Sequence, residues 1–103
     1  MCGVGGTARE WDVEFLVRAD NNLPPDMPEQ RRNELRAAER ERAVRLREDG
    51  TLQRLWRVPG RTGWIGLFEA PDATALHDAL ASLPLWPWLD VTVEPLATHP
   101  QER

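Results

Sequence analysis

The order in which two apolar periodicities follow one another is the strongest constraint on the fold of this chain of 103 residues. Apolar side chains three and four positions apart, typical of a helix, occupy 28–49 and a second segment from Asp72 to Leu83. Alternation typical of a strand covered on one face occurs in DVEFLVRA (12–19), TLQRLWRV (51–58), TGWIGLFE (62–69) and DVTVEPL (90–96). The predicted order is therefore strand, helix, strand, strand, helix, strand.

Proline and glycine residues separate these segments. NNLPPDMP (21–28) contains three prolines, which lack the amide hydrogen that a ladder or helix needs, and its last residue suits the first turn of a helix. Gly50 is expected to end that helix, and PGR (59–61) to form a hairpin turn. Asp72 is expected to cap the second helix, which Pro84 stops.

This order is the split βαβ, or ferredoxin-like, plan of an α+β protein, with a four-stranded antiparallel sheet and two helices on one face. We expect a single domain over 11–103, because a chain of this length has room for one core. Residues 1–10 are rich in glycine and aperiodic, and we expect them to form a flexible N-terminal leader.

The sheet face that the helices leave bare is expected to combine apolar and charged side chains. It would carry Glu14, Leu16, Arg18, Thr92 and Glu94, with either Arg54 and Trp56 or Leu55 and Arg57 from the hairpin. A half-apolar face is usually covered by a second subunit or lines a ligand cavity. We do not assume that the first and last strands are neighbours, so the charges of this face need not converge.

Charge and composition argue against several classes of protein. Thirteen arginines stand against seventeen acidic residues, and the arginines of 31–47 are interleaved with carboxylates, which predicts a solvated helix and no nucleic-acid partner. Two histidines and one cysteine are too few for a His/Cys metal cluster or a disulfide. No apolar run approaches the roughly 20 residues of a membrane helix, and the N-terminus lacks signal-peptide features. We expect a cytoplasmic protein with no membrane partner.

Glu39 is the most informative single residue. On a helix of about 100° per residue it lies about 40° from Leu35, between Leu46 and Ala43, and therefore on the apolar stripe. A carboxylate held there would be desolvated, which raises its pKa and suits a general base or acid. The alternative is an ion pair with Arg42, three residues further on.

Two further groups of side chains are candidates for binding. Arg18 has a guanidinium fork that fits a carboxylate, whereas Glu14 and Glu94 are expected to be charges at an interface or rim. Arg54, Trp56 and Arg57 bring two cations and an indole together, an arrangement that suits a planar anion. Structural packing of Trp56 is an equal alternative.

The chain resembles the muconolactone delta-isomerase family, small bacterial enzymes of aromatic-ring catabolism. The motifs that carry the resemblance are FLVR (15–18), LPPDMP (23–28), LRAAE (35–39), GTLQRLWRVPGR (50–61), LHDALASLPLWPWLDVTVEPLA (76–97) and His99-Pro100. The resemblance implies a ferredoxin-like fold, no cofactor, no metal, and decamers with pockets near the subunit contacts. It also implies isomerisation of a five-membered unsaturated lactone that bears a carboxylate.

Such a 1,3-proton shift needs one base to remove a proton and return it to another carbon, and Glu39 fits that role. The dienolate formed on the way needs a cation, which Arg54 or Arg57 would supply, while Arg18 would hold the substrate carboxylate. The best-known family members carry a histidine where this chain has Arg54. The alternatives are a related isomerase or cyclase acting on another lactone or polyketide-like intermediate, and a ligand-binding or assembly module without catalysis.

A homo-oligomer is expected on separate grounds. The segment Leu85–Leu89 is apolar and contains two tryptophans, which a small monomer could hardly cover alone. Together with the bare sheet face, it is the predicted contact with other subunits, in a dimer-based assembly and possibly a decamer.

Overall fold

The computed structural model describes residues 12–103 and confirms the predicted order of strands and helices. The predicted leader, residues 1–10, lies outside the described residues. The elements are β1 (Val13–Asn21), α1 (Glu29–Glu48), β2 (Leu52–Arg57), β3 (Trp64–Ala70), α2 (Ala73–Ala81), the short 3-10 helix η1 (Trp86–Trp88), β4 (Leu89–Leu96) and the 3-10 turn η2 (Pro100–Glu102).

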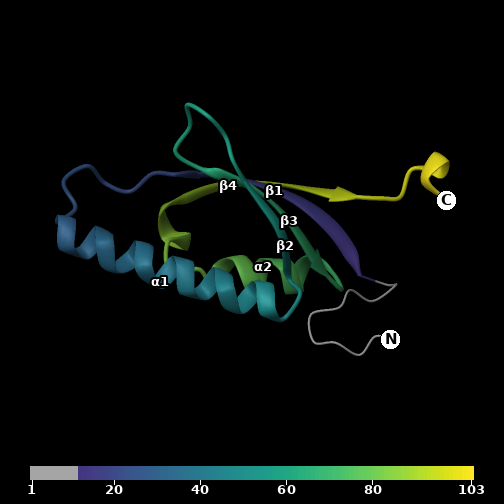
Figure 1. Ribbon diagram of the computed structural model, residues 1–103, viewed down its shortest axis with the longest axis horizontal. Helices are drawn as coiled ribbons and strands as arrows, with labels where there is room; N and C mark the ends of the chain where they lie inside the picture. The colour runs from purple at the N-terminus through teal and green to yellow at the C-terminus, as the bar shows by residue number, and fades with distance from the viewer. Residues whose placement is uncertain (1–11) are drawn as a thin grey trace.

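The four strands form one antiparallel sheet in the order β2-β3-β1-β4. β1 is central and pairs with both β3 and β4, so the first and last strands are neighbours, which the sequence did not establish. Both helices lie on the same side of the sheet, and the other side is open (Figure 1). The predicted ferredoxin-like arrangement is therefore confirmed.

Alternation along β1 sorts its side chains between the two faces of the sheet. Phe15, Val17 and Ala19 are each at most 4% exposed and point toward the helices, whereas Glu14 and Arg18 lie on the open face and are exposed. Burying an apolar side chain contributes roughly 1.5–3 kcal/mol, so this face anchors the fold. The core cluster comprises Phe15, Val17, Leu46, Leu52, Phe68, Ala70, Leu76, Leu80 and Leu83.

α2 has a side-chain cap at its N-terminus, whereas α1 has none and contacts the core through few buried residues. Asp72 caps α2 as predicted, since its Oδ1 accepts the Ala75 N–H at 2.8 Å. Within α1 only Leu35 and Leu46 are buried. The apolar spacing of α1 would also admit Ala38 to the buried stripe, but Ala38 is exposed, because it lies about 100° from Glu39 at the centre of that stripe.

The apolar segment Leu85–Leu89 is largely covered within its own chain, contrary to the expectation that it needs another subunit. Leu85 is 5% exposed, and Trp86 packs against the core, with its ring 5.6 Å from that of His77 and perpendicular to it. The Asn22 N–H donates to the Trp88 carbonyl at 2.9 Å. The turn η1 folds the segment back onto the chain, and Trp86, Trp88 and Leu89 remain partly exposed.

Close backbone packing at the start of β3 requires glycine at position 63. A Cβ on Gly63 would overlap the carbonyl oxygen of Ala19 on β1, where neither backbone can move without breaking the sheet. Gly60, in the hairpin turn, has a φ of +81° but open space around the position that a Cβ would take.

We predict that Gly63→Ala lowers the free energy of unfolding by at least about 3 kcal/mol, because the methyl group collides with backbone. Gly60→Ala should cost only about 1 kcal/mol, since it imposes a left-handed conformation without a collision. Urea denaturation of both variants measures the difference. Equal losses would contradict the close approach of β1 to Gly63.

Candidate active site

A cavity of about 620 Å³ lies between α1, the β2–β3 hairpin and the turn that follows α2. One end is apolar, because Leu46, Leu52 and Phe68 meet there, and the other end is formed by Arg57, Thr62 and neighbouring groups. The lining residues are Asn21, Arg36, Glu39, Arg40, Ala43, Leu46, Leu52, Leu55, Trp56, Arg57, Thr62, Gly63, Trp64, Phe68, Leu83 and Leu85.

Glu39 lines this cavity from the middle of α1, as the helical spacing predicted. Its Oε1 accepts the Leu85 N–H at 3.0 Å, a bond between residues 46 positions apart in the chain. Partial burial raises the pKa of Glu39 above its usual value of 4.5, and the Leu85 hydrogen bond opposes part of that rise. The carboxyl is therefore held by a backbone donor, while burial favours its protonated form.

The alternative interpretation, in which Glu39 pairs with Arg42, does not hold in the structure. Arg42 instead donates from Nε to Ser82 Oγ at 2.8 Å, which connects α1 to the end of α2. On the helix the two side chains lie about 60° apart, so Arg42 faces α2 while Glu39 faces the cavity. No charged side chain of the described residues forms an ion pair with the Glu39 carboxylate.

An irregularity in β2 decides which hairpin residues face the cavity. The register with β3 shifts between Leu52 and Arg54, so Leu52 pairs with Phe68 but Arg57 pairs with Trp64. Leu55 and Arg57 consequently lie on the helix side with Leu52, and both line the cavity. Regular alternation from Leu52 would have placed Arg54 and Trp56 there instead.

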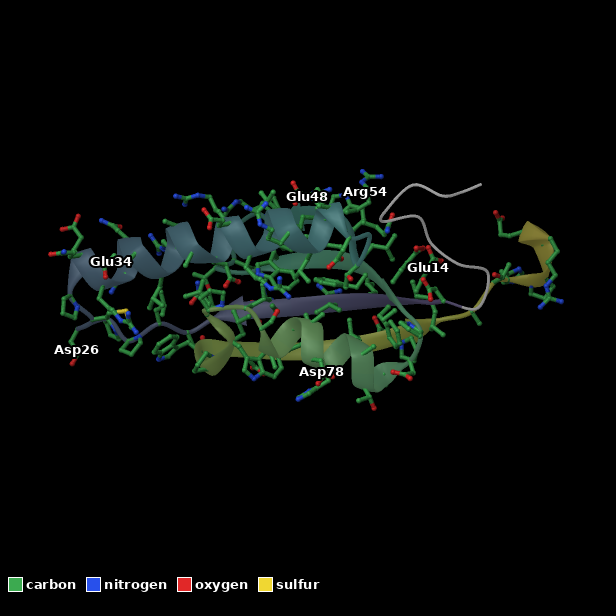
Figure 2. The ribbon with its side chains drawn as sticks, turned by 90° about the horizontal axis from the view of Figure 1, so that it is seen from below. Glu14, Asp26, Glu34, Glu48, Arg54 and Asp78 are labelled. Carbon is green, nitrogen blue, oxygen red and sulfur yellow. The ribbon has the colours of Figure 1, made fainter. Side chains whose placement is uncertain are left out.

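Arg54, predicted as a catalytic residue, lies outside the cavity of its own chain. Its guanidinium carbon stands 5.0 Å from the centre of the Trp56 ring, a cation–π contact on the open side of the sheet. Figure 2 shows Arg54 at the margin of the molecule, pointing outward. Trp56 lines the rim of the cavity and remains 40% exposed.

Arg18, predicted to hold the substrate carboxylate, is also separated from Glu39 within the chain. It is exposed on the open face, opposite Ile65 of β3 and Thr92 of β4, because even-numbered positions of β1 point away from the helices. Glu14 lies on the same face and directly opposite Glu69 of β3. Burial, together with the charges of Glu14 and Asp12, raises the pKa of Glu69.

The sequence reasoning missed two arginines that line the cavity, Arg36 and Arg40 of α1. The same helical rotation that singled out Glu39 places them about 60° and about 100° from it, on the side of Ala43. The sequence pattern does not distinguish them from a solvated charged face, since the α1 segment contains arginine and glutamate in nearly every turn.

The residues that the structure describes contain neither a candidate metal site nor a candidate membrane span. Within 12–103, no three histidine, cysteine, aspartate or glutamate side chains gather in a way that could hold a metal ion. In the same range, no helix is both long enough and apolar enough to span a bilayer. The charged groups that line the cavity are one carboxylate, that of Glu39, and the guanidinium groups of Arg36, Arg40 and Arg57.

The part of the chain that builds the cavity matches a family of known proteins. Residues 13–102 match the family model described as Muconolactone delta-isomerase. The chain belongs to this family. The resemblance predicted from the sequence motifs is confirmed, and the matched range contains every residue that lines the cavity.

Individual family members are similar over nearly the whole described chain. The Muconolactone Delta-isomerase of Pseudomonas aeruginosa is 41% identical over 86 residues, which are 84% of this chain and 90% of that protein. The protein of the same name from Cupriavidus pinatubonensis is 40% identical over 84% of this chain and 94% of its own length. A crystal structure of muconolactone isomerase superposes with a TM-score of 0.80 at 40% identity, covering 84% of this chain and 91% of that one.

The raised pKa of Glu39 predicts how stability depends on pH. Because the folded protein holds the Glu39 proton more tightly than the unfolded chain does, this group's contribution to stability falls as pH rises from 4.5 through the raised pKa. Glu39→Gln keeps an acceptor for the Leu85 N–H and removes the titration. We expect the variant to be at least as stable as the wild type at pH 7.

Urea denaturation of both proteins between pH 4 and pH 7 checks this prediction. The difference in unfolding free energy between Glu39→Gln and the wild type should grow with pH across the range. A difference that stays constant would show that Glu39 titrates normally. Glu69 also titrates at a raised pKa, but it is present in both proteins and cancels from the comparison.

Proposed function

We propose that this protein is a cofactor-independent isomerase that shifts a double bond within an unsaturated lactone carboxylate, muconolactone or a close analogue. The observation that carries the proposal is Glu39, a half-buried carboxylate with a raised pKa, held by one backbone amide inside a cavity large enough for a small lactone. Membership of a family whose named members are muconolactone delta-isomerases supports the same reaction.

The proton transfer needs only one base. In its ionised form Glu39 removes a C–H proton that is acidified by conjugation with the lactone carbonyl, and the electron pair of that bond moves into a dienolate. The same carboxyl then returns the proton to the other end of the three-carbon unit. Because the Leu85 N–H occupies Oε1, Oε2 is the oxygen free to carry the proton.

The rest of the cavity supports this chemistry. Leu46, Leu52 and Phe68 provide an apolar end that limits hydration of the carboxylate and of the lactone ring. Arg57 lines the cavity from β2, so between the two arginines predicted to stabilise the dienolate oxygen, Arg57 is the one we assign. Trp56 at the rim offers an indole against which a planar ring can pack.

We infer that the protein is a homo-oligomer whose subunits meet through the open sheet face. Leu96 is 40% exposed there, and Leu16, Ile65 and Leu67 are only half-buried. Arg18 and Arg54 also lie on this face, so we assign them to subunit contacts or to a neighbouring subunit's pocket. We place the enzyme in the cytoplasm, where aromatic-ring catabolism would deliver its substrate.

The catalytic assignment predicts that Glu39→Gln lowers kcat by about 10²–10⁴-fold on muconolactone, because the amide cannot accept the proton. Glu41→Gln is the matched control, since Glu41 is exposed on the same helix and does not line the cavity. Proton NMR of the substrate follows the double-bond shift directly. Activity retained in Glu39→Gln would remove this residue from the mechanism.

The proposed assembly predicts that a charge placed on the open sheet face weakens the contact between subunits. Leu96→Glu should reduce the mass measured by light scattering, because a carboxylate would be buried between subunits. Val44→Glu is the control, since Val44 is 49% exposed on α1 and does not line the cavity. A monomeric wild type, or equal masses for both variants and the wild type, would contradict the proposed interface.

A further inference from the structure

The seven arginines of α1 differ in whether the protein itself occupies their guanidinium groups. Four that lie outside the cavity are bonded: Arg32 to the Pro24 carbonyl, Arg42 to Ser82, Arg45 to Glu48 and Arg47 to the Gln53 carbonyl. Arg36 and Arg40 line the cavity, and among residues 12–103 neither has a hydrogen-bond or ion-pair partner. Both arginines of α1 that line the cavity therefore have guanidinium groups without a protein partner among the described residues.

The positions of Arg36 and Arg40 on α1 place them next to each other and next to Glu39. Four residues apart, their side chains lie on the same side of the helix, about 40° from each other. Like charges at this spacing repel each other and destabilise a helix. A bound anion would remove that repulsion, so the pair is better suited to a liganded state than to an empty one.

The charge of the cavity as a whole points to an anionic ligand. Its lining contains the three arginines Arg36, Arg40 and Arg57 and one carboxylate, so its formal charge is +2 when Glu39 is ionised. The whole chain has a net charge of −4. Positive charge is thus concentrated at this cavity within an acidic protein, and Arg57 reaches it from a different element, β2.

Arg36 and Arg40 lie on one side of Glu39 around the axis of α1, away from the core. Arg42 and Leu35 lie on the side of Glu39 that faces α2 and the core, whereas Arg36 and Arg40 lie on the opposite side, toward the edge strand β2. Arg36 and Arg40 are exposed, in contrast to Leu46 and Phe68 at the apolar end. The pair therefore stands at the open side of the cavity.

We propose that Arg36 and Arg40 form a clamp that binds the carboxylate arm of the substrate at the cavity mouth, while its ring reaches Glu39. Two guanidinium groups from successive turns supply several parallel N–H donors for the two carboxylate oxygens. The clamp takes over the role predicted for Arg18, which lies on the opposite face of the same sheet. The identity of the ligand as a lactone carboxylate rests on the proposed function.

The clamp predicts selective loss of affinity for substrates that carry a carboxylate. Arg36→Gln and Arg40→Gln should each raise KM for the lactone carboxylate about tenfold, and the double variant about a hundredfold, with kcat little changed. The methyl ester of the same lactone, which has no charge on that arm, should show the same KM in every variant. Arg31→Gln is the matched control, because Arg31 is an exposed arginine of α1 that does not line the cavity.

Two results would overturn the clamp. If the double variant loses affinity for the ester as much as for the carboxylate, the arginines act through the shape of the cavity or through Glu39. If neither KM nor kcat changes, they do not contact the substrate. Circular dichroism and thermal melting verify that each variant is folded.

A binding measurement separates this inference from the proposed function. The saturated lactone carboxylate cannot isomerise, and its binding can be followed by the fluorescence of Trp56 and Trp64, which line the cavity. If the wild type binds it and the double variant binds it about a hundredfold more weakly, the clamp holds even if no lactone is turned over. If lactone is turned over but affinity is equal in both proteins, the proposed function stands and the clamp is wrong.

Discussion

The hydrogen bond from the Leu85 amide to Glu39 connects α1 to the turn that follows α2, at the carboxylate that we propose as the base. Glu39 belongs to α1, and Leu85 belongs to the turn after α2, so the bond spans the gap between the helices over the sheet. A carboxylate in the apolar stripe of a helix is costly to desolvate, and one backbone donor offsets only part of that cost. The remaining imbalance keeps the pKa of Glu39 raised, which is the property that a proton shuttle at moderate pH requires.

The two faces of the sheet carry different kinds of surface. On the helix side, the apolar residues of β1 and β3 form the core that holds α1 and α2, and the cavity occupies the space that α1 leaves beside the edge strand β2. On the open side, half-buried apolar residues alternate with charged ones, as in Leu16 and Arg18. The first arrangement suits a small anion with a planar ring, and the second suits another protein surface.

Much of the fold and part of the site could be predicted from local patterns. Alternation in β1 and the placement of Glu39 on the stripe of α1 follow from fixed rotations per residue, and Asp72 caps α2 as its residue type indicates. Arg54 and Arg57 could not be sorted in this way, because the register shift in β2 reverses the alternation after Leu52. The same helical rotation places Arg36 and Arg40 near Glu39, but arginines on a helix rich in charged residues are also typical of a solvated face.

The sequence by itself determined the order of the elements, the single carboxylate on an apolar stripe and the family to which the chain belongs. Only the tertiary structure decided which cations share the cavity with that carboxylate, that Leu85 supplies its hydrogen bond, and that Arg42 is occupied by Ser82. The physical reason is that rotation per residue fixes a side chain's direction within its own element. Its partner comes from another element, and that depends on strand register and on how helices seat against the sheet.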